Sequence, residues 1–525
     1  MDLLQIGLES WIGHQDRDEH YNWYYTRPEN LVSFLEELKA ERLAKLPPQE
    51  SGMPEPVIHL QFGAVLLTSS IEEALLEVLA ASVEAYAVFC SEGVQITDQM
   101  DKGFYQRKRP QVLPSGKTPE EQIAFLEQII FSGQYGAKLK IDSFDISPRF
   151  KGRVQYKGHS RVQFDGDFGE DFQQLYTYHY NLSAFNMALE LWQEYDKLGD
   201  CQIKIEIIPM RKGSLYDMLE PIIVEEEQLD QPIILPPNEE VGFYSVSILA
   251  RGRGILEFGV MHWRYSRQGY GTFIFGGKRD SDAKKQEFIS YFNPGDMKPP
   301  LTVYFSAFRG AEGFEGFYMM KSLKTPFMLI GDPRLEGGSF YIGSEEFEEK
   351  LQGRIQEALD YLGFDGSQMI LSGLSMGTFG ALYYASRFNP YGIVVGKPFT
   401  NLGDTVRGMR LKRPDEFETI GDVFINSLGT NSRQLLESLN QKFWDKFSES
   451  DFLETKFAIA YMKNDDYDGT AAEKLIEHLS PKKSHIFAQG YSGRHNDDSR
   501  SINKWFMSEY VKMLREGFDR FRKDD

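Results

Sequence analysis

The sequence predicts a mixed α/β protein whose C-terminal part is built on a doubly wound parallel sheet. After about residue 296, apolar strand-like runs alternate strictly with helical patterns, as in a parallel sheet covered by helices. Between about 140 and 290, short segments rich in β-branched and aromatic residues are separated by turns, which favours an antiparallel sandwich. The 525 residues are too many for one hydrophobic core, so we expect two or three domains.

Residues 1–140 predict a small α/β unit in which apolar runs alternate with segments of helical spacing. The last two helical segments begin after a Ser and a Thr cap. The expected strands are DLLQIGL (2–8), VIHLQFGAVLLT (57–68) and AYAVFC (85–90). The expected helices are LVSFLEELKAERLAKL (31–46), SIEEALLEVLAASVEAY (70–86) and TPEEQIAFLEQII (118–130).

Residues 141–290 predict a β-sandwich with one helical intrusion, ALELWQEYDKL (188–198). Aromatic side chains recur at every second position of some strands, which suits either stacking on sugars or core packing. They are Tyr176, Tyr178, Tyr180, Trp263 and Tyr265. The expected strands are AKLKIDSFDI (137–146), QLYTYHYNLSA (174–184), CQIKIEIIPM (201–210), VGFYSVSILARG (241–252), ILEFGVMHWRYS (255–266) and GTFIFGG (271–277).

Residues 291–525 predict the parallel-sheet domain, with a mostly helical insertion at 400–455. The expected strands are LTVYFSAF (301–308), PFMLIGD (326–332), QMILSG (368–373), GIVVGKP (392–398), KFAIAYMK (456–463) and HIFAQG (485–490). The expected helices are EEFEEKLQGRIQEALDYLG (345–363), TFGALYYASRF (378–388), TAAEKLIEHL (470–479) and RSINKWFMSEYVKMLREGFDRF (500–521).

Composition excludes several function classes. The formal net charge of −20 disfavours nucleic acid as a partner and direct docking on anionic lipid. Two distant cysteines, Cys90 and Cys201, favour a reducing cytoplasm over a disulfide-stapled secreted domain. We expect no signal peptide and no transmembrane segment, because the N-terminus lacks a basic region and no apolar run reaches about 20 residues. Peripheral contact with a membrane stays open.

One pentapeptide, Gly373-Leu374-Ser375-Met376-Gly377, has the G-x-S-x-G pattern of a nucleophile elbow. A predicted strand precedes it and a predicted helix follows it. The residues two before and two after the serine approach each other in such a turn, and both are glycine here. The alternative is a Gly-rich packing turn with an idle serine. The context favours an α/β-hydrolase-like domain with Ser375 as its nucleophile.

A serine nucleophile needs a base and an orienting acid, which follow in the order Ser, acid, His in this fold. We expect His495 as the base, because it lies in the loop between the last predicted strand and the last helix. His478 lies inside a predicted helix, where we expect it at the surface, and His485 is committed to a strand. The acid is expected just after the preceding strand, at Asp465.

Asp466 and Asp468 are alternatives for the acid, since all three carboxylates belong to one short loop that could also be a solvated turn. The oxyanion is expected to be held by backbone N–H groups. One donor is Met376, directly after the nucleophile. The other is Ala307 or Phe308, in the Gly-rich loop after the strand at 301–308. The HQDRDEH segment (14–20) fits no metal-binding spacing, so we predict no metal. Because no G-x-G-x-x-G motif lies between a predicted strand and a predicted helix, we predict no bound cofactor.

Several stretches resemble a known family, the accessory Sec system protein of Gram-positive cocci that is the second of the accessory secretion proteins. They are DLLQIGLESW, YFNPGDMKPPLTVYFSAFRGAEGFEGF, GLSMGTFGALYYAS and GRHNDDS, and the resemblance spans essentially the whole chain. It implies an O-acetyltransferase that modifies N-acetylglucosamine on serine-rich-repeat glycoprotein adhesins in the cytoplasm. The implied triad is Ser375, Asp465 and His495, and relatives with Glu at the acid position are expected.

The resemblance also implies partners: other accessory secretion proteins, an accessory SecA-type motor and the glycosylated adhesin. It implies that the β-sandwich is carbohydrate-binding-module-like and holds the glycan. The acetyl donor remains unknown, because no nucleotide or coenzyme signature is present. The residues alone support acyl transfer or ester hydrolysis at a serine, so a carbohydrate esterase and a non-catalytic export adaptor remain alternatives.

Overall fold

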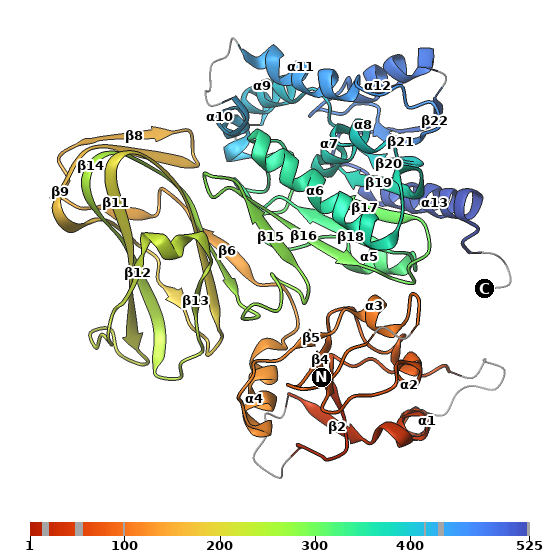
Figure 1. Cartoon of the computed structure of the whole chain (residues 1–525). Helices are drawn as coiled ribbons and strands as arrows, with labels where there is room; N and C mark the ends of the chain where they lie inside the picture. The colour runs from red at the N-terminus through yellow and green to blue at the C-terminus, as the bar shows by residue number, and fades with distance from the viewer. Residues whose placement is uncertain are drawn as a thin grey trace. The chain divides into compact units, whose positions relative to one another are not determined.

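The computed structural model describes residues 1–12, 20–47, 56–97, 100–413, 416–428, 435–482 and 484–521 (Figure 1). By its internal contacts the chain divides into two compact units. Unit 1 comprises Met1–Gly133, Arg267–Gly276 and Asn293–Met297. Unit 2 comprises Gln134–Ser266, Gly277–Phe292 and Lys298–Asp525. Among the helices within the described ranges, none is long and apolar enough to cross a membrane.

Unit 1 contains a five-stranded parallel sheet in the order β2-β1-β3-β4-β5. The strands are β1 (Asp2–Ile6), β2 (Asn22–Thr26), β3 (Ala64–Leu67), β4 (Val88–Cys90) and β5 (Gln111–Val112). The helices are α1 (Leu31–Ala44), α2 (Glu73–Leu76), α3 (Phe104–Lys108) and α4 (Pro119–Ile129). The structure confirms the Thr118 cap, which forms a capping box with Glu121.

The helix predicted from residue 70 is wrong in its start and length. Only the four residues of α2 are α-helical, and no side chain caps them. The buried Glu73 carboxylate accepts the backbone N–H groups of Met100 at 3.0 Å and Tyr105 at 2.9 Å. These contacts tie the segment to residues distant in sequence, and they outweigh its helical periodicity.

The first part of unit 2 is a nine-stranded sheet whose strands pair antiparallel. Its main path is β12-β11-β14-β9-β7. The strands are β6 (Gly136–Leu139), β7 (Phe144–Ile146), β8 (Arg153–Lys157), β9 (Arg161–Tyr178), β10 (Leu182–Ser183), β11 (Leu189–Arg211), β12 (Ile222–Glu225), β13 (Ile233–Leu235) and β14 (Val241–Tyr265). Where the sequence predicts two packed sheets, the structure has one continuous sheet.

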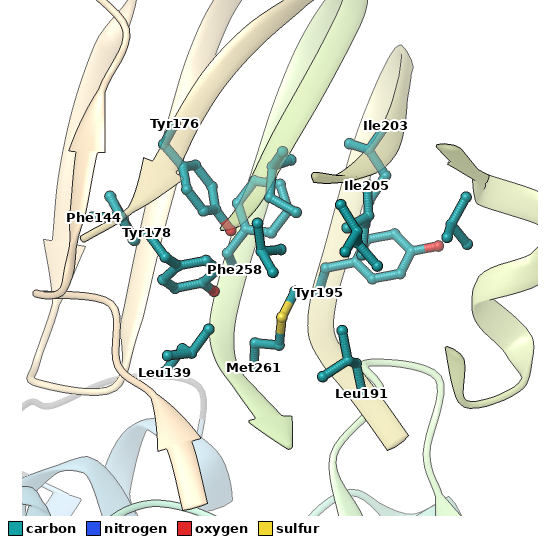
Figure 2. Packing of buried hydrophobic residues seen from close by; sticks show 14 of the residues in the cluster. Leu139, Phe144, Tyr176, Tyr178, Leu191, Tyr195, Ile203, Ile205, Phe258 and Met261 are labelled. Carbon is teal, nitrogen blue, oxygen red and sulfur yellow. The ribbon is translucent and has the colours of Figure 1, made fainter. Parts of the chain in front are cut away.

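Long strands explain how one sheet surrounds a core. Register shifts interrupt the pairing of β14 with β9 and with β11, and such bulges bend a strand. The strands therefore curve (Figure 1), and their inner faces meet around a shared cluster of side chains. Figure 2 shows Phe144 and Tyr176 beside Phe258 of β14, with Ile203 and Ile205 of β11 in the same cluster.

Two predictions in this region are wrong. ALELWQEYDKL is not a helix, because all but its first residue lies in β11, paired with β14 from Leu189↔Tyr265 onward. Cross-strand pairing and burial override its helical spacing. GTFIFGG is not a strand. Its backbone turns with positive φ at Gly271, Phe273 and Gly276, and the Phe273 carbonyl accepts a hydrogen bond from the buried Arg267 guanidinium.

The second part of unit 2 is an eight-stranded sheet in the order β15-β16-β18-β17-β19-β20-β21-β22. The strands are β15 (Lys278–Ser281), β16 (Glu287–Asn293), β17 (Leu301–Phe305), β18 (Phe327–Gly331), β19 (Met369–Leu374), β20 (Gly392–Gly396), β21 (Lys456–Met462) and β22 (His485–Tyr491). β17 to β22 pair in parallel, so the predicted strands of this domain are confirmed.

The helices of this part are α5 (Phe317–Ser322), α6 (Glu345–Leu362), α7 (Met376–Tyr383), α8 (Ala385–Phe388), α9 (Leu402–Lys412), α10 (Asp422–Leu428), α11 (Leu436–Phe447), α12 (Ala471–Leu479) and α13 (Ser499–Phe518). α7 packs on β17 and β19, whereas α13 packs on β20 and β21. α9, α10 and α11 form the predicted helical insertion.

A buried ion network joins the two sheets of unit 2. Glu312, in the loop after β17, accepts hydrogen bonds from His262 and from Arg264 Nε at 2.9 Å, both residues of β14. Arg264 also pairs with Glu287 of β16, and His262 Nε2 lies 3.2 Å from Glu194 of β11. Burial would raise the pKa of Glu312, but the charges of His262 and Arg264 hold it well below its ordinary range.

His262, Glu287 and Glu312 place possible metal-ligand atoms within 4.8 Å of one another. However, the Arg264 guanidinium binds both carboxylates, so their charge is already compensated. The arrangement therefore favours a structural ion network.

Replacing Glu312 with Gln is expected to destabilise unit 2 by about 3–5 kcal/mol, because the buried Arg264 guanidinium would lose one of the two carboxylates that offset its charge. Urea titration followed by circular dichroism measures the change. The matched control is Glu240→Gln, which removes the exposed pair with Arg211 and should cost less than about 1 kcal/mol. Equal shifts for the two variants would contradict the structural importance of the network.

Candidate active site

Ser375 lies on a strained turn between β19 and α7. Its backbone has φ 49° and ψ −123°, a conformation that L-residues rarely adopt and that is typical of functional sites. The Ser375 N–H donates to the Gly396 carbonyl at the end of β20, at 2.8 Å. The neighbouring strand therefore holds the backbone that presents the hydroxyl.

Close backbone contacts explain why both of these positions in the pentapeptide are glycine. A Cβ atom on Gly377 would lie 2.0 Å from the Phe305 carbonyl oxygen of β17. A Cβ atom on Gly373 would lie 2.3 Å from the backbone of Gly377. Both contacts are with backbone, which cannot swing away, so strand, turn and helix can approach this closely only with glycine at both positions.

Replacing Gly377 with Ala is expected to destabilise unit 2 by about 1–3 kcal/mol and to displace Ser375, because α7 must move away from β17. Gly353→Ala provides a matched control. Gly353 lies in the middle of α6, and a Cβ atom there would have no neighbour within 4 Å, so the change should stabilise by about 0.5–1 kcal/mol. Thermal denaturation of both variants gives opposite signs if the interpretation is correct.

Three of the predicted residues are hydrogen-bonded in a line. The Ser375 Oγ lies 2.8 Å from His495 Nε2, and His495 Nδ1 lies 2.8 Å from Asp465 Oδ2. The exposed fraction of the His495 side chain is 2% and that of Asp465 is 6%. With its Nδ1–H donated to the carboxylate, the imidazole presents Nε2 as an acceptor to the hydroxyl. This is the geometry of a serine activated by a general base.

The other two acids of the loop contact different groups. Asp466 accepts the backbone N–H of His495 at 3.1 Å and pairs with Arg413. Burial would raise the pKa of Asp466, but these contacts lower it. Asp468 is buried and accepts the N–H groups of Thr400 at 2.8 Å and Asn401 at 2.7 Å. Of these three carboxylates, Asp465 is the one that is hydrogen-bonded to the ring of His495, so we keep it as the candidate acid.

Aromatic rings flank the imidazole, which the sequence analysis missed. The Tyr467 ring stacks on His495 with a centroid distance of 4.4 Å, and Phe399 lies at 5.2 Å. The Tyr467 hydroxyl donates to Glu416 in the helical insertion at 2.6 Å. Tyr467 lies in the same short loop as the three candidate acids, and this position is the sequence signal that could have pointed to it. The rings fix the plane of the imidazole and keep water from it.

The predicted oxyanion donors differ in their present contacts. Met376 is the first residue of α7, where backbone N–H groups have no partner within the helix. The Ala307 N–H donates to the Glu315 carboxylate at 2.7 Å, and Tyr304 also donates to it, at 3.2 Å. Ala307 can therefore serve an oxyanion only after Glu315 moves. The Phe308 side chain lines the cavity beside Ser375. The oxyanion role of Met376, Ala307 and Phe308 stays a prediction.

A cavity of about 490 Å³ opens onto Ser375 and His495. It lies where loops leave the carboxyl ends of β17, β19, β20, β21 and β22, the usual ligand-binding edge of a parallel sheet. The lining is partly apolar and partly polar, and the helical insertion contributes three side chains, those of Met409, Glu416 and Phe417. The apolar lining includes Phe308, Phe340, Phe399, Met409, Phe417 and Ile502, and the polar lining includes Glu315, Lys397, Glu416, Asn496, Ser499 and Asn503.

The other described residues that the sequence analysis considered do not line this cavity. His478 is half-buried, because one side of its ring packs against Trp444 and Phe447, whereas the sequence predicts a surface position. Tyr176 and Tyr178 belong to the core of the antiparallel sheet, with Trp263 and Tyr265 packed against it, whereas Tyr180 is exposed. Core packing thus explains most of the aromatic row. The HQDRDEH segment lies, except for its last residue, outside the described residues.

Comparison with known proteins shows to which family the chain belongs. A sequence model of the family described as "Asp2: Accessory Sec system GspB-transporter" matches residues 1–520. The chain belongs to this family. The resemblance seen in the sequence is therefore confirmed over nearly its whole length.

Two curated proteins named "Accessory Sec system protein Asp2" are similar to the chain. The Staphylococcus aureus (strain NCTC 8325 / PS 47) protein is 40% identical over 461 residues, which is 88% of each chain. The Streptococcus gordonii protein is 36% identical over 521 residues, which is 99% of each chain. Among solved structures, a chain of the "Glycosylation Associate Protein (Gap123) complex from Streptococcus agalactiae" has a TM-score of 0.89 and 40% identity, with 99% of each chain covered.

Proposed function

We propose that this member of the accessory Sec system family is a serine-dependent O-acetyltransferase that modifies sugars on a glycoprotein before its export. The observation that carries the proposal is the hydrogen-bonded line from Ser375 through His495 to Asp465. A serine on a strained elbow, a base at 2.8 Å and an orienting carboxylate are the parts that nucleophilic acyl transfer needs.

The geometry supports a two-step reaction. In the first step Ser375 Oγ attacks the acetyl carbonyl while His495 Nε2 takes its proton, and Asp465 stabilises the imidazolium that forms. The N–H of Met376 would hold the developing oxyanion, together with Ala307 or Phe308 once Glu315 has moved. The bond between the acetyl carbon and the donor's leaving group then breaks, and the leaving group takes the proton from His495. In the second step a sugar hydroxyl gives its proton to His495 and attacks the acetyl-enzyme. The bond from the acetyl carbon to Ser375 Oγ breaks, and His495 returns the proton to the serine.

The acceptor is proposed to be N-acetylglucosamine on a serine-rich-repeat adhesin. Family membership and the name of the S. agalactiae complex, a glycosylation-associated one, support this part. By the same likeness we propose that the chain works in the cytoplasm with other accessory secretion proteins, and that the complex delivers the adhesin to an accessory SecA-type motor. The curved antiparallel sheet is proposed to hold the glycan.

Mass spectrometry of a glycosylated acceptor peptide tests the proposal. The purified protein is incubated with the acceptor and with acetyl-coenzyme A or p-nitrophenyl acetate, and each added acetyl group raises the acceptor mass. Acetate release without a mass gain would identify a carbohydrate esterase on the same residues. Failure of a fluorophosphonate to label the protein would exclude an activated serine and leave a non-catalytic export adaptor.

A further inference from the structure

Lys397 is a buried lysine in the catalytic cavity that the reaction scheme does not use. It follows β20 directly, and the Ser375 N–H is bonded to the carbonyl of the residue before it. Its exposed fraction is 6%, and its side chain lines the cavity together with Ser375 and His495. The Lys397 Nζ donates to Ser499 Oγ at 2.8 Å.

Three features of this position are energetically unfavourable for a lysine. The backbone of Lys397 has φ +60°, which is strained for a residue with a long side chain. Ser499 is the first residue of α13, a helix of 20 residues, and the N-terminal end of a helix repels a cation. Burial lowers the pKa of the Lys397 ammonium, which shows that the surroundings disfavour its charge.

Protein contacts do not offset these costs. Lys397 forms no ion pair with any residue in the described ranges, and its side chain has the one hydrogen bond to Ser499. An ammonium carries three N–H donors, so two of them remain for a group in the cavity. A strained and buried lysine whose side chain has a single hydrogen bond to the protein is a feature that folding stability does not explain, and it is typical of ligand-binding sites.

The charges around Lys397 indicate what kind of ligand it binds. Asp465, Asp497 and Asp498 act on it electrostatically, and each favours the ammonium form. Glu315 and Glu416 also line the cavity. Because these carboxylates outnumber the single lysine, a phosphate or carboxylate ligand would be repelled. A neutral ligand with polar oxygens fits, since Lys397 and Asn503 donate hydrogen bonds and the carboxylates accept them.

We propose that Lys397 is the residue that positions the acyl acceptor, by donating from its ammonium to a neutral oxygen of a polyhydroxylated substrate beside Ser375. This inference rests on the proposed transferase activity. The backbone of Lys397 has a separate role, because its N–H donates to the Ala460 carbonyl at 2.8 Å. A change of the side chain therefore removes the acceptor contact and leaves the backbone bonds that hold the nucleophile loop.

The test separates the two half-reactions in Lys397→Met. Labelling by a fluorophosphonate reports formation of the covalent serine adduct, and mass gain of the glycosylated acceptor reports transfer. Transfer should fall about 10- to 100-fold, the range expected for losing a hydrogen bond to a charged donor, while labelling falls by less than threefold. The KM for acceptor should rise, whereas the KM for p-nitrophenyl acetate should not. Lys397→Gln, which keeps an N–H donor, should recover part of the transfer.

Lys324→Met is the matched control. Lys324 also has a positive φ, of +53°, and is exposed outside the cavity lining, so its substitution should leave both measurements unchanged. A parallel fall of labelling and transfer in Lys397→Met would overturn the inference, because the side chain would then act on the nucleophile. Unchanged transfer would overturn it as well. If wild-type protein is not labelled at all, the proposed function itself fails.

Discussion

Replacing Ser375 with Ala is expected to abolish acetyl transfer, with a fall in turnover of about 10⁶-fold. The variant lacks the hydroxyl oxygen that lies 2.8 Å from His495 Nε2 on the strained elbow, so no acetyl-enzyme can form at residue 375. The fold should persist, because the Ser375 backbone N–H keeps its bond to Gly396. Mass spectrometry of the acceptor and fluorophosphonate labelling measure the loss.

Ser367→Ala is the control for this variant, because Ser367 is exposed just before β19. It should retain wild-type labelling and transfer. In cells, we expect Ser375→Ala to stop glycan acetylation while adhesin export continues, if the protein also has a structural role in its complex. Unchanged acetylation with Ser375→Ala would refute the enzymatic proposal.

Replacing Asp465 with Asn is expected to lower turnover by about 10⁴-fold. The amide can donate to His495 Nδ1, which favours the tautomer with the proton on Nε2. That nitrogen then cannot accept the proton of the serine hydroxyl, and the imidazolium loses its stabilising charge. Transfer assays with matched circular dichroism spectra separate this loss from unfolding.

Two variants of the same loop sharpen this prediction. Asp465→Glu should retain measurable transfer, because a longer carboxylate can still reach Nδ1 after adjustment. Asp466→Asn should lower transfer less than about tenfold, since Asp466 contacts the backbone and not the ring of His495. A larger loss in Asp466→Asn than in Asp465→Asn would reassign the acid.

The parallel-sheet domain was predictable because its central strands are apolar and buried on both faces. The runs before Ser375 and around Val394 are examples, and helices of regular spacing separate them. The antiparallel sheet was harder. Leu189 to Leu198 has helical spacing, yet pairing with β14 makes it a strand. That pairing joins residues far apart in sequence, which local patterns do not report.

The site was predictable where topology alone brings residues together. Ser375, Asp465 and His495 each follow the carboxyl end of a parallel strand, so the chain order placed them at one edge. Glu315 and Lys397 were not predicted. Glu315 contacts the Ala307 N–H and the Tyr304 hydroxyl, and Lys397 contacts the Ser499 hydroxyl. No spacing in the sequence predicts such contacts.

The loop that follows β17 is anchored at two points. Near its start Ala307 lines the catalytic cavity, and in its middle Glu312 is clamped by His262 and Arg264 of the antiparallel sheet. Packed interiors transmit small displacements instead of absorbing them. A shift of β14 would therefore reach Ala307, whose amide is a predicted oxyanion donor. We expect the proposed acyl transfer to depend on the position of a sheet that contributes none of Ser375, His495 and Asp465.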